Sequence, residues 1–300
     1  MKPNELIAKI ENGELDKSFK KIYVSDSAVE EQKPRYIRTI KEFINLFGDD
    51  RDVFVLSAPG RTEVCGNHTD HNNGKVLAAS INLDAIAIAA KRDDMKINEK
   101  SEGHGLNEVD ISTLSPDETE YGRSSSMIKG VAAGLKEKGY EIGGFDACTT
   151  SDVMGGSGLS SSAAFEVLIA TVINHLYNDG KIDAVTVAKA AQFSENVYFG
   201  KPSGLLDQMA SSVGTFVTID FKDTANPVIK KVDFDFAKSG YSLCIVDTHG
   251  NHSDLTDDYA AVRGEMEAVA KAMGKNVLRE VEYEEFFQSL VHPLVFAEEV

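Results

Sequence analysis

At its centre the chain reads Val153-Met154-Gly155-Gly156-Ser157-Gly158-Leu159-Ser160-Ser161-Ser162-Ala163, and an apolar run follows from Phe165. Three of four consecutive residues are glycines, which let the backbone approach a ligand without a Cβ in the way. The serines open a helix, and the free N–H groups and dipole of a helix N-terminus favour an anion. The stretch therefore predicts a phosphate site, and a plain glycine-serine loop is the alternative.

The helix after the glycines is expected from Leu159 to Tyr177, with Asn178-Asp179-Gly180 as its C-terminal signal. Apolar side chains lie nearly all round it, so the helix should be buried. Two known phosphate loops are excluded. A Walker loop needs lysine where Leu159 stands, and a dinucleotide fingerprint needs glycine where Ser161 stands.

Composition is that of a globular protein, with 300 residues, 42% hydrophobic and 26% charged. A net charge of −17 argues against a nucleic-acid partner, because duplex binding depends on cations that face phosphates. The sequence contains neither a signal-peptide core nor an apolar run of about 18 residues, so we expect a cytoplasmic protein without a membrane partner. The spacing and odd number of cysteines suggest neither a disulfide framework nor a zinc site; they are Cys65, Cys148 and Cys244.

Three parts are expected along the chain. Residues 1–50 should form a helical arm in which Pro34 begins or interrupts the last helix. Residues 51–225 should form an N-terminal domain that carries the glycine stretch. Residues 226–300 should form part of a second domain, after a linker at residues 223–227.

Apolar runs predict the strands of these domains. Val53 to Leu56 should be a short strand that ends in a turn at Ala58-Pro59-Gly60, and Val76 to Ala90 should be one or two buried strands. Strands are also expected at residues 145–150, 215–221 and 243–247. Helices are expected at residues 127–135, 183–198, 205–212, 255–273 and 280–290.

A second polar cluster lies between two expected core strands. It reads Arg61-Thr62-Glu63-Val64-Cys65-Gly66-Asn67-His68-Thr69-Asp70-His71-Asn72-Asn73-Gly74. So polar a stretch is either a solvated hairpin or a functional site, and composition does not choose between them.

Three segments, in order, resemble the signature regions of galactokinases, within the GHMP family of small-molecule kinases. Gly60-Arg61 with residues 66–74 is similar to the sugar-binding signature, and residues 156–163 are similar to the ATP-binding motif. Residues 199–208, which read Phe-Gly-Lys-Pro-Ser-Gly-Leu-Leu-Asp-Gln, resemble the segment that bears the catalytic aspartate. Three ordered matches over about half the chain make chance agreement negligible.

The resemblance implies an α+β fold of two GHMP kinase-like domains, with mixed sheets, flanking helices and an active site in the cleft between the domains. It implies transfer of phosphate from ATP, with Mg²⁺, to the 1-hydroxyl of galactose or a close relative. Asp207 would be the catalytic base, and Arg61 would be the cation beside it. Ser162 and Glu195 would hold the metal, as a hydroxyl and a carboxylate can.

Each of these residues also has a simpler interpretation. Asp207 could be an ordinary helix cap or surface carboxylate, and Arg61 could be a solvated residue after a turn. Glu195 could lie on the exposed face of its helix. Phosphoryl transfer nevertheless needs groups of these kinds, namely a proton acceptor and fixed positive charge near the phosphate.

The resemblance also implies binding residues. His68 and Asp70 would hydrogen-bond sugar hydroxyls within a signature that includes Asn67 and Thr69, and Tyr259 resembles the family's sugar-contacting tyrosine, although its helical spacing also fits core packing. The residues of the ATP motif are Gly156, Ser157, Gly158, Leu159, Ser160, Ser161 and Ser162. A metal site is the alternative for two groups of residues, which are His68, Asp70 and His71, and His249 with His252.

Two departures from the family pattern are present. Asn67 stands where the family usually has glutamate, and an amide can donate as well as accept, so the sugar preference can differ. After Tyr259 the sequence contains no glycine-rich third motif. We therefore expect an incomplete second domain whose uncovered apolar faces favour self-association.

Two other functions stay open at this point. The missing third motif favours a non-catalytic sugar and nucleotide sensor, or an inactive truncated remnant. A GHMP kinase for another small alcohol is the second alternative, against which the sugar signature argues. The presence of Asp207, Arg61 and Glu195 favours catalysis.

Overall fold

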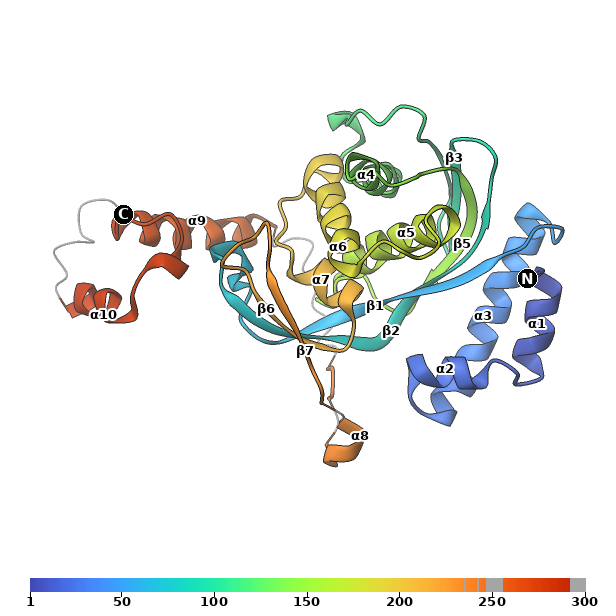
Figure 1. Cartoon of the computed structure of the whole chain (residues 1–300), viewed down its shortest axis with the longest axis horizontal. Helices are drawn as coiled ribbons and strands as arrows, with labels where there is room; N and C mark the ends of the chain where they lie inside the picture. The colour runs from blue at the N-terminus through green and yellow to red at the C-terminus, as the bar shows by residue number, and fades with distance from the viewer. Residues whose placement is uncertain (235, 242, 247–255, 292–300) are drawn as a thin grey trace. The chain divides into compact units, whose positions relative to one another are not determined.

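A computed structural model describes residues 1–234, 236–241, 243–246 and 256–291 (Figure 1). The chain divides into two compact units, each assembled from distant segments. The larger unit comprises Met1–Arg61, Ser80–Gly155 and Leu159–Gly214. The smaller unit comprises Thr62–Ala79, Gly156–Gly158 and the described residues from Thr215 onward. The domain boundaries expected from the sequence stay a prediction.

A mixed sheet forms the middle of the larger unit. Its strands, in the order β4-β3-β5-β2, are β4 (Leu106–Asp110), β3 (Lys96–Ser101), β5 (Phe145–Ser151) and the second half of β2 (Lys75–Lys91). Strand β3 runs parallel to β5 and antiparallel to β4, and β2 runs antiparallel to β5. Strand β1 (Phe54–Cys65) also pairs with β2.

Helices cover both faces of this sheet (Figure 1). One layer is α1 (Pro3–Glu11), α2 (Asp16–Tyr23) and α3 (Asp26–Phe47). The other is α4 (Ser124–Glu137), α5 (Ser161–Tyr177), α6 (Ala184–Phe193) with the π-helical turn η3 (Ser194–Phe199), and α7 (Leu206–Val213).

Strand β2 shows how the sequence builds two cores. Ala85, Ala87 and Ala89 pack into the core beneath α4 and α5, whereas Ile86 and Ile88 pack into the core beneath α3. Because successive strand residues point to opposite faces, an uninterrupted apolar run is what a strand covered on both sides requires.

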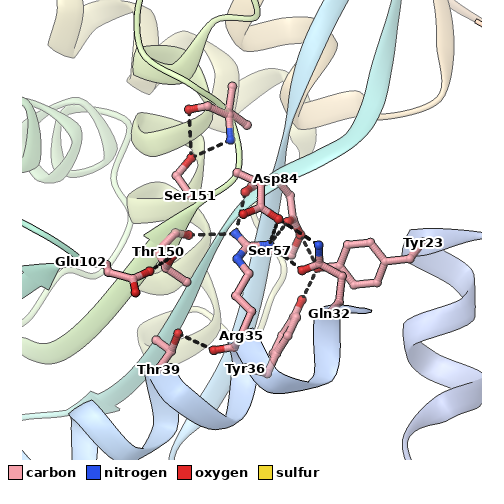
Figure 2. Close-up of polar contacts among 12 residues, drawn as sticks. Tyr23, Gln32, Arg35, Tyr36, Thr39, Ser57, Asp84, Glu102, Thr150 and Ser151 are labelled. Atoms are coloured by element: carbon pink, nitrogen blue, oxygen red, sulfur yellow. Dashed lines mark hydrogen bonds and ion pairs between the residues drawn. The ribbon is translucent and has the colours of Figure 1, made fainter. Parts of the chain in front are cut away.

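A buried polar network joins α3 to the sheet (Figure 2). Arg35 donates to the carboxylate of Asp84 over 2.7 Å and to the Thr150 carbonyl oxygen over 3.0 Å. The other Asp84 oxygen accepts from the Tyr23 hydroxyl at 2.9 Å and from the Ser57 hydroxyl at 2.5 Å. Burial, with the charge of Asp84 as a second cause, raises the pKa of the Tyr23 phenol. The network therefore links the N-terminal helices, through Asp84, to strand β1.

The smaller unit contains a three-stranded antiparallel arrangement. The first half of β2 pairs with β6 (Phe216–Asp220), which pairs with β7 (Val228–Val232). Its helical elements are η1 (Thr69–Asn72), α8 (Phe236–Ser239), α9 (Thr256–Ala272), η5 (Leu278–Glu280) and α10 (Tyr283–Val291). No described helix is both long and apolar enough to span a bilayer.

Two expectations for the larger unit were wrong. Pro34 lies inside the continuous helix α3, because buried contacts of Val29 before it and Tyr36 after it outweigh one missing backbone hydrogen bond. Ala58-Pro59-Gly60 is part of strand β1 and not a turn. Neighbouring segments complete its hydrogen bonds, since the Pro59 carbonyl oxygen accepts from the Ser211 hydroxyl at 2.7 Å.

Two expectations for the smaller unit were also wrong. Residues 223–227 lie in the hairpin loop between β6 and β7, so they are not a linker between separate structures. Residues 243–246 form no strand and are exposed, because no described strand pairs with them; Asp247 lies outside the described residues. Exposed apolar side chains of this unit include Val246 at 79% and Tyr283 at 69% exposure. The incomplete second domain and its self-association stay predictions.

Candidate functional site

Arg61 and Asp207 form an ion pair in the larger unit. The Nε atom of Arg61, at the middle of β1, donates to Oδ1 of Asp207 over 2.6 Å. Oδ2 of the same carboxylate accepts from the hydroxyl of Ser160 at 2.5 Å. Arg61 is buried, whereas 29% of the Asp207 side chain is exposed. The carboxylate is therefore held at both oxygens and still reaches solvent.

Close packing fixes the backbone that carries Arg61. The N–H of Arg61 donates to the carbonyl oxygen of Leu159 over 3.1 Å. A Cβ at Gly60 would lie 2.9 Å from that same oxygen and 3.0 Å from a methyl group of Val153. Only glycine lets the strand and the Leu159 segment approach so closely.

The start of α5 brings Ser160 to this ion pair. The helix begins at Ser161, two residues later than expected, because Ser160 adopts a left-handed conformation with φ of 60°. Leu159 is buried in the core. The first N–H groups of any α-helix have no partner within the helix, and the phosphate site at this turn stays a prediction. Gly156, Ser157 and Gly158 belong to the smaller unit, where both glycines have positive φ.

Glu195 is buried at 2% exposure, so the interpretation as an exposed-face glutamate was wrong. Its Oε1 accepts from the Ser162 hydroxyl at 3.2 Å and from the Lys201 ammonium at 2.9 Å. Its Oε2 accepts from the Gln208 amide at 2.7 Å. The two residues predicted to hold a metal therefore contact each other directly.

Glu166 adds a second buried carboxylate to this cluster. Gln208 Nε2 lies 3.4 Å from Glu166 Oε2, while Glu166 Oε1 has no hydrogen-bond partner among the described residues. Burial, with the charge of Glu195 as a second cause, raises the pKa of the Glu166 carboxyl well above its usual range. Hydroxyl and carboxylate oxygens are the ligands that Mg²⁺ prefers, so the donor set at Ser162 and Glu195 fits that ion.

The predicted sugar residues lie in the smaller unit. Asn67 and His68 both have positive φ, at 50° and 54°. The carboxylate of Glu63 holds this turn by accepting from the His68 N–H at 3.1 Å. Asp70 is buried, with Oδ1 lying 3.8 Å from Nδ1 of His68, and the N–H of Thr69 donates to Gly66.

The same turn contains the three residues for which a metal site was the alternative interpretation. Possible donor atoms of His68, Asp70 and His71 all lie within 4.8 Å of one another. His249 and His252 lie outside the described residues.

Asn72, which the sequence did not single out, anchors this turn. Its amide Nδ2 donates to the sulfur of Met266 in α9 over 2.9 Å, and its Oδ1 accepts from the N–H of Leu278 at 3.2 Å. Tyr259 lies in α9, as its spacing predicted, but its side chain is outside the described residues.

Four other contacting residues were also missed, namely Glu63, Glu166, Lys201 and Gln208. Lys201 and Gln208 lie inside a quoted motif and Glu63 lies inside the quoted polar cluster, which were the available signals, whereas Glu166 looks like part of an apolar helix.

The segments that carry these residues match known protein families. The galactokinase galactose-binding signature matches residues 41–91, and the N-terminal domain of GHMP kinases matches residues 126–215. A galactokinase of Streptomyces coelicolor is 34% identical over 245 residues, which is 81% of this chain and 62% of that protein. A galactokinase of Clostridium tetani is 33% identical over 255 residues, which is 82% of this chain and 63% of that protein.

Solved structures agree with the expected α+β fold. The crystal structure of Lactococcus lactis galactokinase complexed with galactose is 27% identical, with a TM-score of 0.69, and the match covers 86% of this chain and 67% of that one. Methanococcus jannaschii mevalonate kinase, at 13% identity and a TM-score of 0.53, shares the fold alone; that match covers 78% of this chain and 75% of that one. The chain spans less than two thirds of the length of the curated galactokinases named above.

Proposed function

The chain belongs to the galactokinase family of the GHMP kinases, and we propose that it transfers phosphate from ATP to the 1-hydroxyl of galactose or a close relative. The observation that carries the proposal is the carboxylate of Asp207, which Arg61 and Ser160 hold at both oxygens. A fixed, partly exposed carboxylate beside a buried guanidinium is suited to accept a proton while negative charge develops next to it.

In the proposed reaction Asp207 accepts the proton of the sugar 1-hydroxyl. The sugar oxygen forms a bond to the γ-phosphorus as the bond to the ADP oxygen breaks, in line with the attack. Arg61 keeps Asp207 ionised before transfer and offsets charge as the phosphoryl group moves. The proton then leaves Asp207 for solvent, through the exposed side of its carboxylate.

We assign the remaining groups as follows. Ser162 and Glu195 would hold Mg²⁺, which when bound would neutralise charge on the phosphate oxygens. The first turn of α5 and the glycines before it would bind the ATP phosphates. Asn67, His68, Thr69, Asp70 and Tyr259 would contact the sugar. A cytoplasmic location completes the proposal.

The test is a substrate panel for the purified chain. With Mg²⁺ and ATP, we expect galactose to cause ADP release and to yield a sugar 1-phosphate, identified by phosphorus NMR. Glucose and mevalonate serve as comparison alcohols. Release of ADP with another alcohol alone would favour a different GHMP kinase. Calorimetric binding of galactose and ATP without turnover would favour the sensor.

A further inference from the structure

The ammonium group of Lys201 forms an ion pair with Glu195, the carboxylate that would bind Mg²⁺ in the proposed function. Its Nζ is 2.9 Å from Glu195 Oε1, and this same oxygen accepts from the Ser162 hydroxyl at 3.2 Å. The lysine therefore places its positive charge beside the first turn of α5. We propose that Lys201 is an internal counter-ion that occupies the metal position in the nucleotide-free protein and moves to phosphate oxygens of ATP when the metal binds Glu195. The inference rests on the proposed function.

The backbone around Lys201 is held in place, so only its side chain has to move. The Lys201 N–H donates to the carbonyl oxygen of Glu195 over 3.0 Å, at the end of the π-helical turn. Gly200 has a positive φ of 80°, and a Cβ there would collide with the ring of Tyr121. On the other side, Asn196 accepts from the Ser203 N–H at 2.6 Å. A lysine on this short loop stays within reach of Glu195.

Three carboxylates give the ammonium its charge environment. The Glu195 carboxylate is its ion-pair partner at 2.9 Å, and the charges of Asp207 and Glu166 also act on it. Arg61, the other cation of the site, is already paired with Asp207.

Electrostatics make the metal and the ammonium compete. Two cations on one carboxylate oxygen repel each other strongly, because the repulsion grows as their separation falls. About half of the Lys201 side chain is exposed, at 51%, so the four-carbon stem has room to swing away. The displaced ammonium needs another anionic partner, and lysine binds phosphate well as a point charge. The phosphates of ATP provide that partner at the same site.

The experiment measures binding and does not depend on turnover. Lys201→Met removes the charge and keeps the length of the side chain. Without nucleotide, we expect it to bind Mn²⁺ about tenfold more tightly than the wild type, measured by electron paramagnetic resonance. At saturating Mg²⁺, we expect it to bind ATP about tenfold more weakly, measured by calorimetry. An unchanged affinity in either measurement overturns the proposal.

Two further variants control for fold and for general charge effects. Lys181→Met removes an exposed lysine of the same unit, whose Nζ is also 2.9 Å from a carboxylate, that of Asp179. It should leave both affinities within about twofold of the wild type. Lys201→Arg keeps the charge and should keep weak Mn²⁺ binding. If Lys201→Met fails to fold, tight Mn²⁺ binding by Lys201→Arg overturns the proposal.

The outcomes separate this inference from the proposed function. A wild-type chain that binds neither ATP nor Mn²⁺ would overturn both. A wild-type chain that phosphorylates galactose, with Lys201→Met equal to it in both affinities, would overturn the role of Lys201 alone.

Discussion

Arg61 donates from Nε to Oδ1 of Asp207 over 2.6 Å, although 146 residues separate them along the chain. The pair joins the middle of strand β1 to the start of helix α7. Ser160, which precedes α5, completes the contact from a third element. The proposed catalytic group is therefore held by three segments that pack against one another, so changes at any of them should be measurable.

Substitution of the proposed base should remove turnover and leave nucleotide binding intact. Asp207→Asn keeps the shape of the side chain but cannot accept the sugar proton, so kcat should fall by about 10²- to 10⁴-fold. The measurement is galactose-dependent ADP release, with ATP affinity followed by calorimetry. Asp179→Asn, an exposed aspartate of the same unit, is the matched control. Activity of Asp207→Asn within tenfold of the control would contradict the assignment.

A methyl group at Gly60 should disturb Arg61 through the backbone. In Gly60→Ala the new Cβ would lie 2.9 Å from the Leu159 carbonyl oxygen. This clash is hard to relieve, because the oxygen belongs to the backbone and cannot rotate away as a side chain can. We expect a loss of about 1–3 kcal/mol in the free energy of unfolding and reduced ADP release. Gly105→Ala is the control, since no atom lies within 4 Å of its Cβ position. Equal stability of the two variants would show that β1 has more room than the structure indicates.

The buried ion pair of Arg35 and Asp84 should contribute strongly to the free energy of unfolding, because it joins the N-terminal helices to the sheet. Arg35→Met leaves the Asp84 carboxylate buried without its cation, at a cost of about 3–5 kcal/mol in the free energy of unfolding. Urea unfolding followed by circular dichroism measures this loss. Arg38 lies on the same helix as Arg35, and Arg38→Met breaks its exposed ion pair with Glu102. This substitution should lower the free energy of unfolding by less than about 1 kcal/mol.

A double variant tests the physical reason for that difference. Arg35→Met combined with Asp84→Leu removes both charges, so it should recover part of the stability lost in Arg35→Met alone. Additive losses in the double variant would mean that the two residues act independently.

The sugar signature should control galactose affinity separately from ATP affinity. Asp70 is a buried carboxylate, and an ionised acceptor contributes more to a hydrogen bond than a neutral amide does. Asp70→Asn should therefore weaken galactose binding by about tenfold or more, measured by calorimetry. The exposed Asp233→Asn, in the same unit, should bind like the wild type. A loss of ATP affinity in Asp70→Asn would point to a folding defect instead.

The three cysteines should differ in reactivity. Burial, with the charges of Glu42 and Glu99 as further causes, raises the pKa of the Cys148 thiol to about 12. A raised pKa keeps this thiol neutral at pH 8, and the core excludes the reagent. Native protein should react with Ellman's reagent at the exposed Cys65 and Cys244, and Cys148 should react only after unfolding. Rapid reaction of a third thiol in the native state would contradict the burial.

Local patterns predicted most of the elements around the site. The apolar run from Val76 to Ala90 became strand β2, and Asp183 caps α6 by accepting from the Thr186 N–H at 3.0 Å. Predictions failed where a neighbour overrode the local signal. Pro59 and Gly60 read as a turn because such residues break strands, yet Ser211 and Leu159 supply the partners that keep β1 extended.

The sequence alone was enough to determine the family signatures, the helix that opens after the glycines and the choice of Arg61, Asp207, Ser162 and Glu195. The helix follows from residue type and spacing, whereas the choice of those four residues followed from the resemblance of their segments to the galactokinase signatures. Only the tertiary structure decided that Glu195 is buried and that Lys201 and Gln208 share its oxygens. Such contacts depend on how separate helices and loops pack, and the periodicity of one segment carries no information about which distant side chain will face it.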